Sequence, residues 1–234
     1  MAAMGQLAAG ISHELNQPLT GIKGFTQAVL MDLKKESPIR NDLNKIVEQA
    51  DRMDAIIKNV RFFSRKADFN MAEIDINQVI LNSLALLSQQ LKTHNIRVIQ
   101  EFGSNIPKIQ GDPNQLQQAF LNIISNARDA IISLNRPEGG EIRIHTALSR
   151  DKDHVEIIFR DTGCGVSGAN LQHIFSPFYT TKSPDRGMGL GLSITYRIIE
   201  NHKGIVKFES EEGKGTIFEI VLPIKGAEDE AGRS

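Results

Sequence analysis

The first 66 residues carry the hydrophobic spacing of two long helices. Apolar side chains recur at intervals of three and four from residue 7 to 33, and again, with nearly perfect heptad spacing, from 39 to 60. Between the two runs lies ESPIR, where Ser37 is suited to cap a helix and Pro38 to begin it. We therefore predict an antiparallel helical hairpin whose first helix ends near Glu36. The apolar positions are Leu7, Ile11, Leu15, Ile22, Phe25, Val29 and Leu33, then Ile39, Leu43, Ile46, Ala50, Met53, Ile57 and Val60.

The size of these apolar stripes indicates that the hairpin needs a partner. Each helix would be about 40–50 Å long at 1.5 Å per residue, and two such helices cannot cover both stripes with each other alone. A second copy of the chain would close a four-helix bundle, so the sequence predicts a homodimer. The alternative is a hairpin that packs on the remainder of its own chain.

From about residue 71 the pattern changes to a mixture of strands and amphipathic helices. Strands are predicted at the start of EIDINQVILNSLALLSQQL, at NIRVIQEF, and as pairs in EIRIHTALS with HVEIIFRD and within GIVKFESEEGKGTIFEIVLP. Helices are predicted after an Asn77 cap, after an Asp112 cap with Pro113 in the first turn, and in GLGLSITYRIIENHKG, with Gly204 as its stop.

Strands in one sheet with three helices on one face make an α/β sandwich. The predicted fold class of the whole chain is therefore α+β. The helical hairpin is expected at 1–67, the sandwich at 68–225 and a polar tail at 226–234, with a linker near Arg65–Asn70.

Composition narrows the class of protein. A chain of 234 residues with 40% hydrophobic and 24% charged residues is typical of a soluble globular protein with one large or two small domains. A formal net charge of −1 argues against a protein built mainly to bind nucleic acid or anionic membrane. We see no signal-peptide pattern and no apolar run of about 18 residues. The use of a single cysteine is compatible with a reducing cytoplasmic compartment, which is the expected location of this part of the protein, and membrane anchoring of the full-length protein is left open. Cys164 is the only cysteine, which excludes an intrachain disulfide and a cysteine metal cluster.

A histidine stands on the outer side of the first predicted helix, in GISHELNQPLTGIKG. At 100° per residue, His13 lies about 160–200° from Ile11 and Leu15, and so faces away from the apolar seam. An ordinary surface histidine would have the same geometry. A zinc motif of the form HExxH is excluded, because Gln17 stands where the second histidine would be.

The neighbours of this histidine favour chemistry. Glu14 is adjacent and could orient the imidazole ring or accept its proton. Pro18 lacks an N–H and clashes with the carbonyl four residues back, which is that of Glu14, so that a kink is predicted at the histidine–glutamate pair. Gly21 and Gly24 weaken the helix further.

Two short polar motifs in the second part suggest ligand contacts. In NIISNARDA, Asn122 and Asn126 are four apart and share a helix face, where amide oxygens can ligate a hard cation, although polar helix faces are common. In RDTGCGV, Asp161 ends a strand, and Gly163 and Gly165 make a tight turn. A turn alone would tolerate this sequence, but a fixed carboxylate there can accept hydrogen bonds from an amino group such as adenine N6.

The run FSPFYTTKSPDRGMGLGLSI is the most informative. Phe175 and Phe178, three apart, are predicted to be hydrophobic anchors. The polar stretch TTKSPDR that follows them has mobile flanks, which suggests a lid over a ligand. The glycines that enter the following helix would offer backbone N–H groups to phosphate. GMGLGL does not fit the dinucleotide pattern GxGxxG, and EGKGT does not fit the P-loop pattern GxxxxGK[ST]. The catalytic-loop and DFG signatures of serine, threonine and tyrosine kinases are absent. These glycines are Gly187, Gly189 and Gly191.

Taken in order, HELNQPL, NIISNARDA, DTGCGV, FSPFYTTK, GMGLGLSI and GKGTIFEIVLP resemble the motifs of bacterial sensor histidine kinases, from Gly5 to Pro223. The resemblance implies a dimerisation and phosphotransfer hairpin, then an ATP-binding domain of the gyrase/chaperone/histidine-kinase type. It implies ATP and Mg²⁺ as cofactors, autophosphorylation on histidine, and transfer to an aspartate in the receiver domain of a response regulator. HELNQPL looks most like kinases that sense nitrogen compounds or dicarboxylates, and a sensor region is expected outside this chain.

The resemblance also implies roles for single residues. His13 resembles the phosphoacceptor and Glu14 the base that withdraws its proton. Asn126 resembles the Mg²⁺ ligand. The remaining implied contacts are Asn122 close to phosphates or metal, Asp161 and Thr216 at adenine, with Gly163 and Gly165 in its turn, Lys182 near the γ-phosphate, and Gly187, Gly189 and Gly191 around the phosphates.

One position departs from the family pattern. Many such kinases have threonine or asparagine four residues after the histidine, where it positions water for dephosphorylation of the regulator. Here that residue is Gln17, whose side chain is one methylene longer than asparagine, so phosphatase activity is left open. Asn16 lies about 100° away around the helix and does not replace it.

Two other functions compete with the kinase. A non-kinase ATPase or conformational clamp could share the ATP-binding fold, but such proteins usually have glutamate where Asn122 stands and lack a histidine-bearing hairpin. An inactive binding scaffold is disfavoured because His13, Asn126, Asp161 and the glycines are all present.

Overall fold

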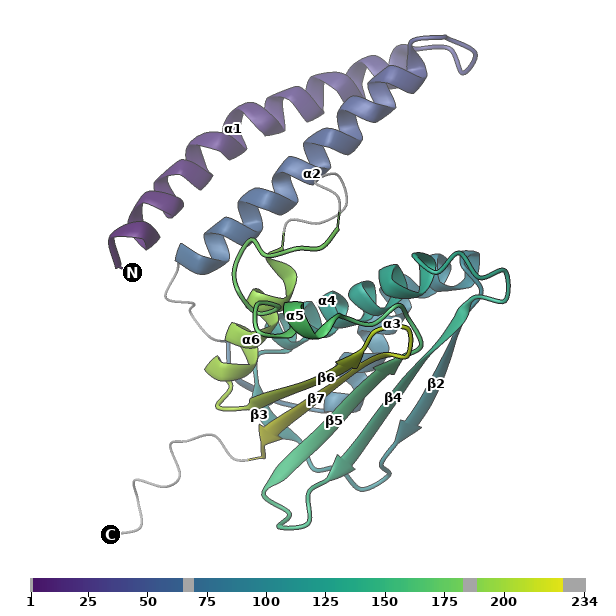
Figure 1. Ribbon diagram of the computed structural model, residues 1–234. Helices are drawn as coiled ribbons and strands as arrows, with labels where there is room; N and C mark the ends of the chain where they lie inside the picture. The colour runs from purple at the N-terminus through teal and green to yellow at the C-terminus, as the bar shows by residue number, and fades with distance from the viewer. Residues whose placement is uncertain (1, 65–69, 183–188, 225–234) are drawn as a thin grey trace. The chain divides into compact units, whose positions relative to one another are not determined.

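The computed structural model describes residues 2–64, 70–182 and 189–224, with backbone only for 2–14 and for part of 52–64. The chain divides into two compact units, Met1–Asp68 and Phe69–Ser234 (Figure 1). Most of the predicted linker and all of the predicted tail lie outside the described residues.

The first unit is an antiparallel pair of helices, α1 (Ala2–Asp32) and α2 (Arg40–Ser64) (Figure 1). The hairpin is as predicted, but α1 ends four residues before Glu36, and α2 begins two residues after Pro38. Arg40 accounts for the earlier end of α1, because its Nη1 donates to the carbonyls of Leu30 and Leu33, each at 3.0 Å. A cation on the last carbonyls of α1 caps that helix early.

The two helices pack along a narrower seam than the sequence predicted. Leu19, Ala50 and Ile57 form its buried cluster. Thr26 is also buried, because its hydroxyl donates to the carbonyl of Ile22 at 2.7 Å. Much of the predicted apolar stripe is instead exposed. These exposed residues are Leu15, Ile22, Phe25, Val29, Ile39, Ile46 and Met53.

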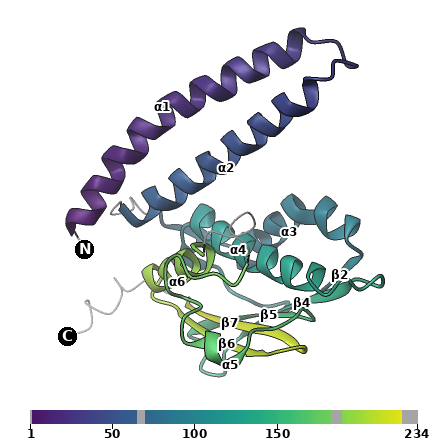
Figure 2. The ribbon, with the colours of Figure 1, turned by 45° about the horizontal axis from the view of Figure 1, so that its top comes forward.

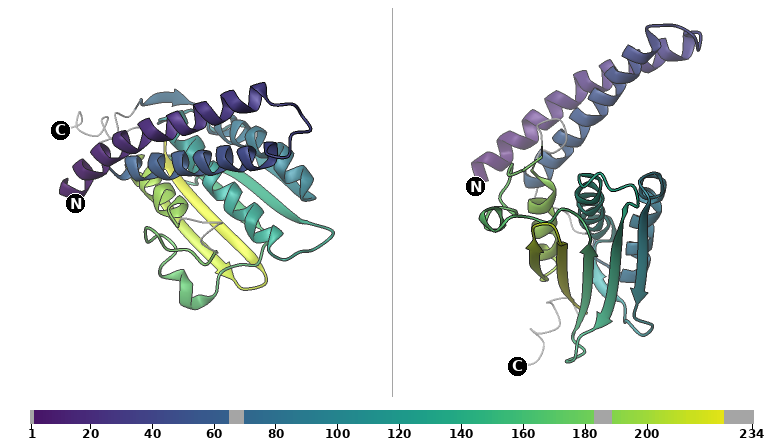
Figure 3. Two further views of the ribbon diagram at one scale, coloured as in Figure 1. Left: turned by 90° about the horizontal axis from the view of Figure 1, so that it is seen from above. Right: turned by 45° about the vertical axis from the view of Figure 1, so that its right-hand side comes forward.

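The second unit is a sheet covered on one face by helices. Strand order is β2-β4-β5-β7-β6, with β2 parallel to β4 and the other pairs antiparallel. Helices α3 (Ile76–Thr93), α4 (Pro113–Ile132) and α6 (Gly191–Asn201) lie on the same face (Figures 2 and 3), as predicted. The strands are β2 (Ile96–Phe102), β4 (Gly140–Leu148), β5 (His154–Asp161), β6 (Ile205–Glu211) and β7 (Gly215–Pro223). A small separate sheet pairs β1 (Ala72–Ile74) with β3 (Ile109–Gly111), and α5 spans Gly168–Leu171.

The core of this unit lies between the helices and the sheet. Alternate residues of β4, β5 and β7 are buried, as the period-two pattern of a one-sided sheet requires. Phe120 of α4 meets Phe159 of β5 with ring centroids 5.5 Å apart. This packing fixes α4, which carries two of the predicted site residues, against the strand that ends at Asp161.

The helix caps confirm one prediction and correct another. Asp112 caps α4, with its Oδ1 accepting from the N–H groups of Asn114 and Gln115. The predicted cap of α3 is wrong, because the capping residue is Asp75, whose carboxylate accepts from the backbone of Asn77 and Gln78. The Asn77 side chain is used elsewhere, accepting from Thr146 Oγ1 at 2.8 Å.

The end of α6 differs from the prediction by one residue. Lys203, with φ of 58°, adopts the left-handed conformation that commonly ends a helix, one residue before the predicted stop at Gly204. The N–H of Lys203 donates to Glu200 and that of Gly204 to Ile199, which is the Schellman pattern. Glycine is still required at 204, because a Cβ there would lie 2.7 Å from the carbonyl oxygen of Val221.

A buried histidine joins the end of α6 to the start of α4. His202 Nε2 accepts the N–H of Asp112 at 2.9 Å, and Nδ1 lies 2.7 Å from the carbonyl of Ile198. Burial lowers the pKa of His202, so the ring is neutral with its proton on Nδ1. Both ring nitrogens are therefore committed to the fold.

Candidate active site

Asp161 is a buried carboxylate at the end of β5, opposite Thr216 of β7. Only 6% of the residue is exposed, and the N–H of Gly163 donates to its Oδ1 at 2.8 Å. Burial raises the pKa of Asp161 to about 6, although backbone hydrogen bonds from Gly163 and Thr216 oppose the rise. The group is thus a rigid acceptor in a site of low polarity, suited to an amino group of a ligand.

The glycines next to Asp161 are required by close packing. A Cβ at Gly163 would lie 2.6 Å from the Cβ of Ala130 on α4. Gly165 has φ of +68°, and Gly215 has φ of +109° with the carbonyl oxygen of Asp161 only 2.0 Å from a Cβ. Gly163 and Gly165 were predicted as turn residues, and Gly215 is a further one that brings β7 onto Asp161.

The hydroxyl of Thr216 is held in place beside this turn. Thr216 Oγ1 and Ser210 Oγ are 3.0 Å apart, and Ser210 Oγ accepts from the N–H of Val166 at 2.9 Å. Thr216 is 7% exposed. The structure therefore places Thr216 with Asp161, as predicted, and adds Ser210, which no motif in the sequence indicated.

The two asparagines of α4 share a face but have different partners. Asn122 Nδ2 donates to the carbonyl of Gly191 at 3.1 Å, which ties α4 to the start of α6. Asn126 Oδ1 accepts from Lys182 Nζ at 3.2 Å. The structure thus brings Asn126 and Lys182 together from distant parts of the chain.

An acid–base cluster surrounds this lysine. Lys182 Nζ lies 2.7 Å from Asp129 Oδ2, and Arg128 Nη2 lies 2.6 Å from Asp129 Oδ1. Burial raises the pKa of Asp129, but hydrogen bonds from Lys182 and Arg128 outweigh it and leave the pKa below its usual value. Asp129 was missed from the sequence, although its place three residues after Asn126 puts it on the same helix face.

The start of α6 offers backbone donors. Leu190 occupies its N-cap position without a side-chain hydrogen bond. Gly189, with φ of +66°, has the carbonyl oxygen of Tyr179 only 2.4 Å from a Cβ. Gly191 meets Asn122 only at ordinary contact distance, and Gly187 lies outside the described residues. An uncapped helix N-terminus is suited to a phosphate group.

The two predicted phenylalanine anchors behave differently. Phe175 packs with its ring centroid 5.4 Å from that of Tyr196 and 6.2 Å from that of Phe208. Phe178 is 70% exposed, with φ of 66°, so its prediction as a buried anchor is wrong. The chain turns at Phe178 through a left-handed conformation, which directs its backbone to Gly189 and its side chain outward.

Comparison with known families now assigns the chain. The family described as "Histidine kinase-, DNA gyrase B-, and HSP90-like ATPase" matches residues 111–226, and the "His Kinase A (phospho-acceptor) domain" matches residues 3–68. The chain belongs to the sensor histidine kinases, of which it carries the kinase core. The α+β fold and the family resemblance are thereby confirmed, while the nitrogen or dicarboxylate subtype stays a prediction.

Two curated relatives of this histidine kinase core are bacterial kinases. Sporulation kinase E of Bacillus subtilis is 38% identical over 222 residues, which are 95% of this chain and 29% of that protein. Sensor histidine kinase ZraS of Salmonella typhimurium is 33% identical over 233 residues, or 96% of this chain and 46% of that protein. The chain thus spans half or less of the length of these relatives.

Two solved kinases have a similar fold. Full-length ShkA in complex with AMPPNP is 26% identical with a TM-score of 0.79, covering 95% of this chain and 46% of that one. ThkA in complex with the response regulator protein TrrA is 25% identical with a TM-score of 0.64, covering 94% of this chain and 62% of that one.

In this histidine kinase core, His13, Glu14 and Gln17 lie on α1, in the first unit, whereas every predicted nucleotide contact lies in the second. The side chains of His13 and Glu14 are outside the description, so the outward direction of His13 stays a prediction. Gln17 is exposed. Pro18 lies inside α1, which continues to Asp32, and the kink at the histidine–glutamate pair stays a prediction. Within the described residues, every helix is too short or too polar to cross a bilayer.

Proposed function

We propose that the chain is an ATP-dependent protein histidine kinase. It autophosphorylates on His13 and passes the phosphoryl group to an aspartate in the receiver domain of a response regulator. The observation that carries the proposal is Asp161, a buried acceptor fixed by Gly163 at a turn that closely packed glycines shape. ShkA binds AMPPNP and ThkA binds TrrA, and similarity to both supports ATP as donor and a regulator as acceptor.

The adenine end of the site is assigned to Asp161. Its carboxylate would accept from adenine N6, while Gly163 and Gly165 keep the turn narrow and Thr216 contacts the base. The phosphates would extend along α4 toward the start of α6. There Gly189 and Gly191 would offer backbone N–H groups, and Asn122 holds the α4–α6 junction. Gly187 is assigned to the same phosphates from its motif alone.

Asn126 is proposed as the Mg²⁺ ligand. Its Oδ1 already faces a cation, the ammonium of Lys182 at 3.2 Å, so the oxygen is directed toward a position where positive charge is stable. Among the described residues, no group of three acidic, histidine or cysteine side chains could hold a metal, so phosphates and water would supply the other ligands. Bound Mg²⁺ would neutralise and align the triphosphate.

The transfer step needs a nucleophile and a proton acceptor. An imidazole nitrogen of His13 attacks the γ-phosphorus, the bond to the β–γ bridging oxygen breaks, and ADP leaves. Glu14 accepts the ring proton. The carboxylate of a receiver aspartate then attacks the phosphorus, the N–P bond breaks, and Glu14 returns the proton to the ring, which restores the neutral imidazole. We also propose that this chemistry takes place in the cytoplasm. We further propose that the whole protein has a sensor region outside this chain.

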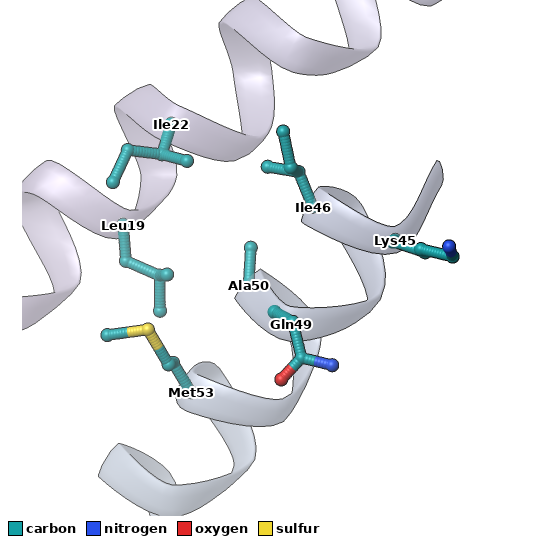
Figure 4. A pocket seen from close by; sticks show the side chains of 7 residues that line it. All are labelled: Leu19, Ile22, Lys45, Ile46, Gln49, Ala50 and Met53. Carbon is teal, nitrogen blue, oxygen red and sulfur yellow. The ribbon is translucent and has the colours of Figure 1, made fainter. Parts of the chain in front are cut away.

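The kinase is further proposed to act as a homodimer through its first unit. Leu19, Ile22, Ile46, Ala50 and Met53 line an apolar groove of about 240 Å³ along the helix pair (Figure 4). Ile22 is 52% exposed and Ile46 43%. A second hairpin would cover these residues and complete a four-helix bundle.

Ile46→Glu is expected to raise the dissociation constant of the dimer by about tenfold or more, because it buries a charge in an apolar interface. Sedimentation equilibrium measures the change. Asn44→Glu is the matched control, since Asn44 is exposed on the same helix and adds the same charge outside the groove. Unchanged association of Ile46→Glu, or a monomeric wild type at every concentration, would contradict the proposal.

Incubation with γ-labelled ATP and Mg²⁺ tests the activity itself. The chain should incorporate acid-labile, base-stable label, as a phosphoramidate does, and lose it rapidly to one member of a panel of receiver domains. EDTA should prevent labelling. Release of free phosphate without any labelled chain would instead identify an ATPase.

A further inference from the structure

We propose that Asp129 is a positioning residue of the nucleotide site, which holds the Lys182 ammonium on the oxygen of Asn126 until Mg²⁺–nucleotide displaces it. The proposal rests on the nucleotide site proposed above. It adds that the Lys182 ammonium of the chain itself competes with Mg²⁺ for the oxygen of Asn126. Lys182 would then have two states, one on Asp129 and one released toward the phosphates.

Three side chains converge to make this contact. Lys182 Nζ lies 2.7 Å from Asp129 Oδ2 and 3.2 Å from Asn126 Oδ1. Asn126 and Asp129 are three residues apart on α4 and so lie on one face, while Lys182 comes from the segment after β5. The side chains of Lys182 and Asp129 are 32% and 30% exposed, so the pair is partly shielded from water.

The charges around Asp129 make the lysine removable. Arg128 donates to Oδ1 from Nε at 3.0 Å and from Nη2 at 2.6 Å, and leaves Oδ2 to Lys182. Arg128 stays with Asp129 when Lys182 departs, so no half-buried carboxylate is left without a cation. Two cations on one carboxylate also repel each other, which weakens the hold on Lys182.

The ammonium and Mg²⁺ cannot both use Asn126. Mg²⁺ binds oxygen at about 2.0–2.1 Å, and an ammonium 3.2 Å from the same Oδ1 would then lie within a few ångström of a dication. Binding of Mg²⁺–nucleotide must therefore expel Lys182, which costs part of the binding free energy. The expelled ammonium is attracted by the phosphate charge that arrives with the metal.

Mg²⁺–ADP is the probe that separates these effects, because it lacks the γ-phosphate to which Lys182 is assigned. Asp129→Asn and Lys182→Met should each bind Mg²⁺–ADP about two- to fivefold more tightly, the range for loss of a partly exposed ion pair. The double variant should bind no more tightly than either single variant. Isothermal titration calorimetry measures all four dissociation constants.

Lys207→Met is the matched control, because it breaks a lysine–carboxylate pair, with Glu219 at 2.6 Å. Both residues occupy positions of β6 and β7 that are not buried beneath the helices. The affinity of Lys207→Met for Mg²⁺–ADP should equal that of the wild type. Lys182→Met gives an independent reading if Asp129→Asn unfolds, since a partly exposed lysine contributes little to stability. Circular dichroism checks the fold of each variant.

Other patterns overturn the proposal. Unchanged or weaker binding of Mg²⁺–ADP by Asp129→Asn would show that Asp129 does not hold Lys182 against the nucleotide. Weaker binding both with Lys182 present and in the Lys182→Met variant would instead indicate that Asp129 is a metal ligand. Tightening by Asp129→Asn that persists in the Lys182→Met background would show that Asp129 does not act through Lys182. Failure of the wild type to bind Mg²⁺–ADP would refute the proposed nucleotide site itself.

Discussion

Asp161→Asn is expected to weaken ADP and ATP binding about 10- to 100-fold, the loss for a buried polar mismatch. Backbone N–H groups of Gly163 and Thr216 already donate to the carboxylate. In the variant, the single amide oxygen of the new side chain accepts from these two N–H groups. The amide NH₂ then takes the place of the second carboxylate oxygen of Asp161. That NH₂ would then face another donor, the adenine amine. Calorimetric titration with ADP measures the loss.

The same substitution should not destabilise the unit at neutral pH. Burial raises the pKa of Asp161 to about 6, above its value in the unfolded chain, so the folded protein holds this proton more tightly. The resulting stability is fully present below about pH 4 and is lost as pH rises through about 6. Asp161→Asn lacks this dependence. The free energy of unfolding of Asp161→Asn, relative to that of the wild type, should therefore increase as the pH rises from about 4 to about 7. Urea denaturation at each pH measures this difference.

Asp151→Asn provides the control for both measurements. Asp151 lies in the exposed turn between β4 and β5, and its hydrogen bond from Ser149 holds its pKa below the usual range. Its stability contribution is present at neutral pH and is lost in acid, the opposite sign to Asp161. Nucleotide affinity should not change. Wild-type affinity in Asp161→Asn would show that Asp161 is not the adenine contact.

Local pattern was enough to predict most elements of the second unit, but not every boundary. Asp75 and Asn77 are both good capping residues, so the sequence around them permits two starts for α3. The earlier start is favoured because it includes Ile76 in the helix, where Ile76 and Ile80 are four apart and both fully buried. Burial in the tertiary structure decides what propensity leaves open.

In the first unit, long-range contacts limited the prediction. α1 ends at Asp32 because Arg40, from the far side of the turn, donates to its last carbonyls. The inner seam includes Thr26, which an apolar pattern cannot detect because its hydroxyl is satisfied within the helix. The exposed residues Ile22 and Phe25 were predicted to belong to the same apolar stripe as the residues buried between α1 and α2. The spacing of apolar residues cannot distinguish a helix face that packs on α2 from a face that would pack on a second chain.

The candidate site shows the same limit. Motifs indicated Asp161, its glycines and Asn126, because each carries a recognisable residue type at a strand end, a turn or a helix face. Asp129 was not identified from the sequence, because its proposed role depends on Lys182, which is 53 residues away in sequence. Phe178 was mistaken for an anchor because its left-handed backbone, not its residue type, decides where the ring points.

His13→Gln is expected to abolish autophosphorylation while leaving nucleotide affinity unchanged. Glutamine has no imidazole nitrogen to attack phosphorus, and the predicted nucleotide contacts all lie in the other unit. His13 is the only histidine in the first unit, because the other five are His94, His145, His154, His173 and His202. Label from γ-labelled ATP should fall to background, and calorimetric titration should give the wild-type affinity for ADP.

The other histidines make this prediction specific. His202 cannot substitute, since its Nε2 accepts from Asp112 and its Nδ1 is held by the carbonyl of Ile198. His94→Gln is the matched control, because His94 is exposed at the end of α3 and the variant should label as the wild type does. Acid-labile label on His13→Gln, mapped by mass spectrometry to a histidine of the second unit, would refute His13 as the phosphoacceptor without excluding ATP binding. Loss of both label and ADP affinity would instead mean that residue 13 supports the fold of the nucleotide site, which its place in a separate compact unit argues against.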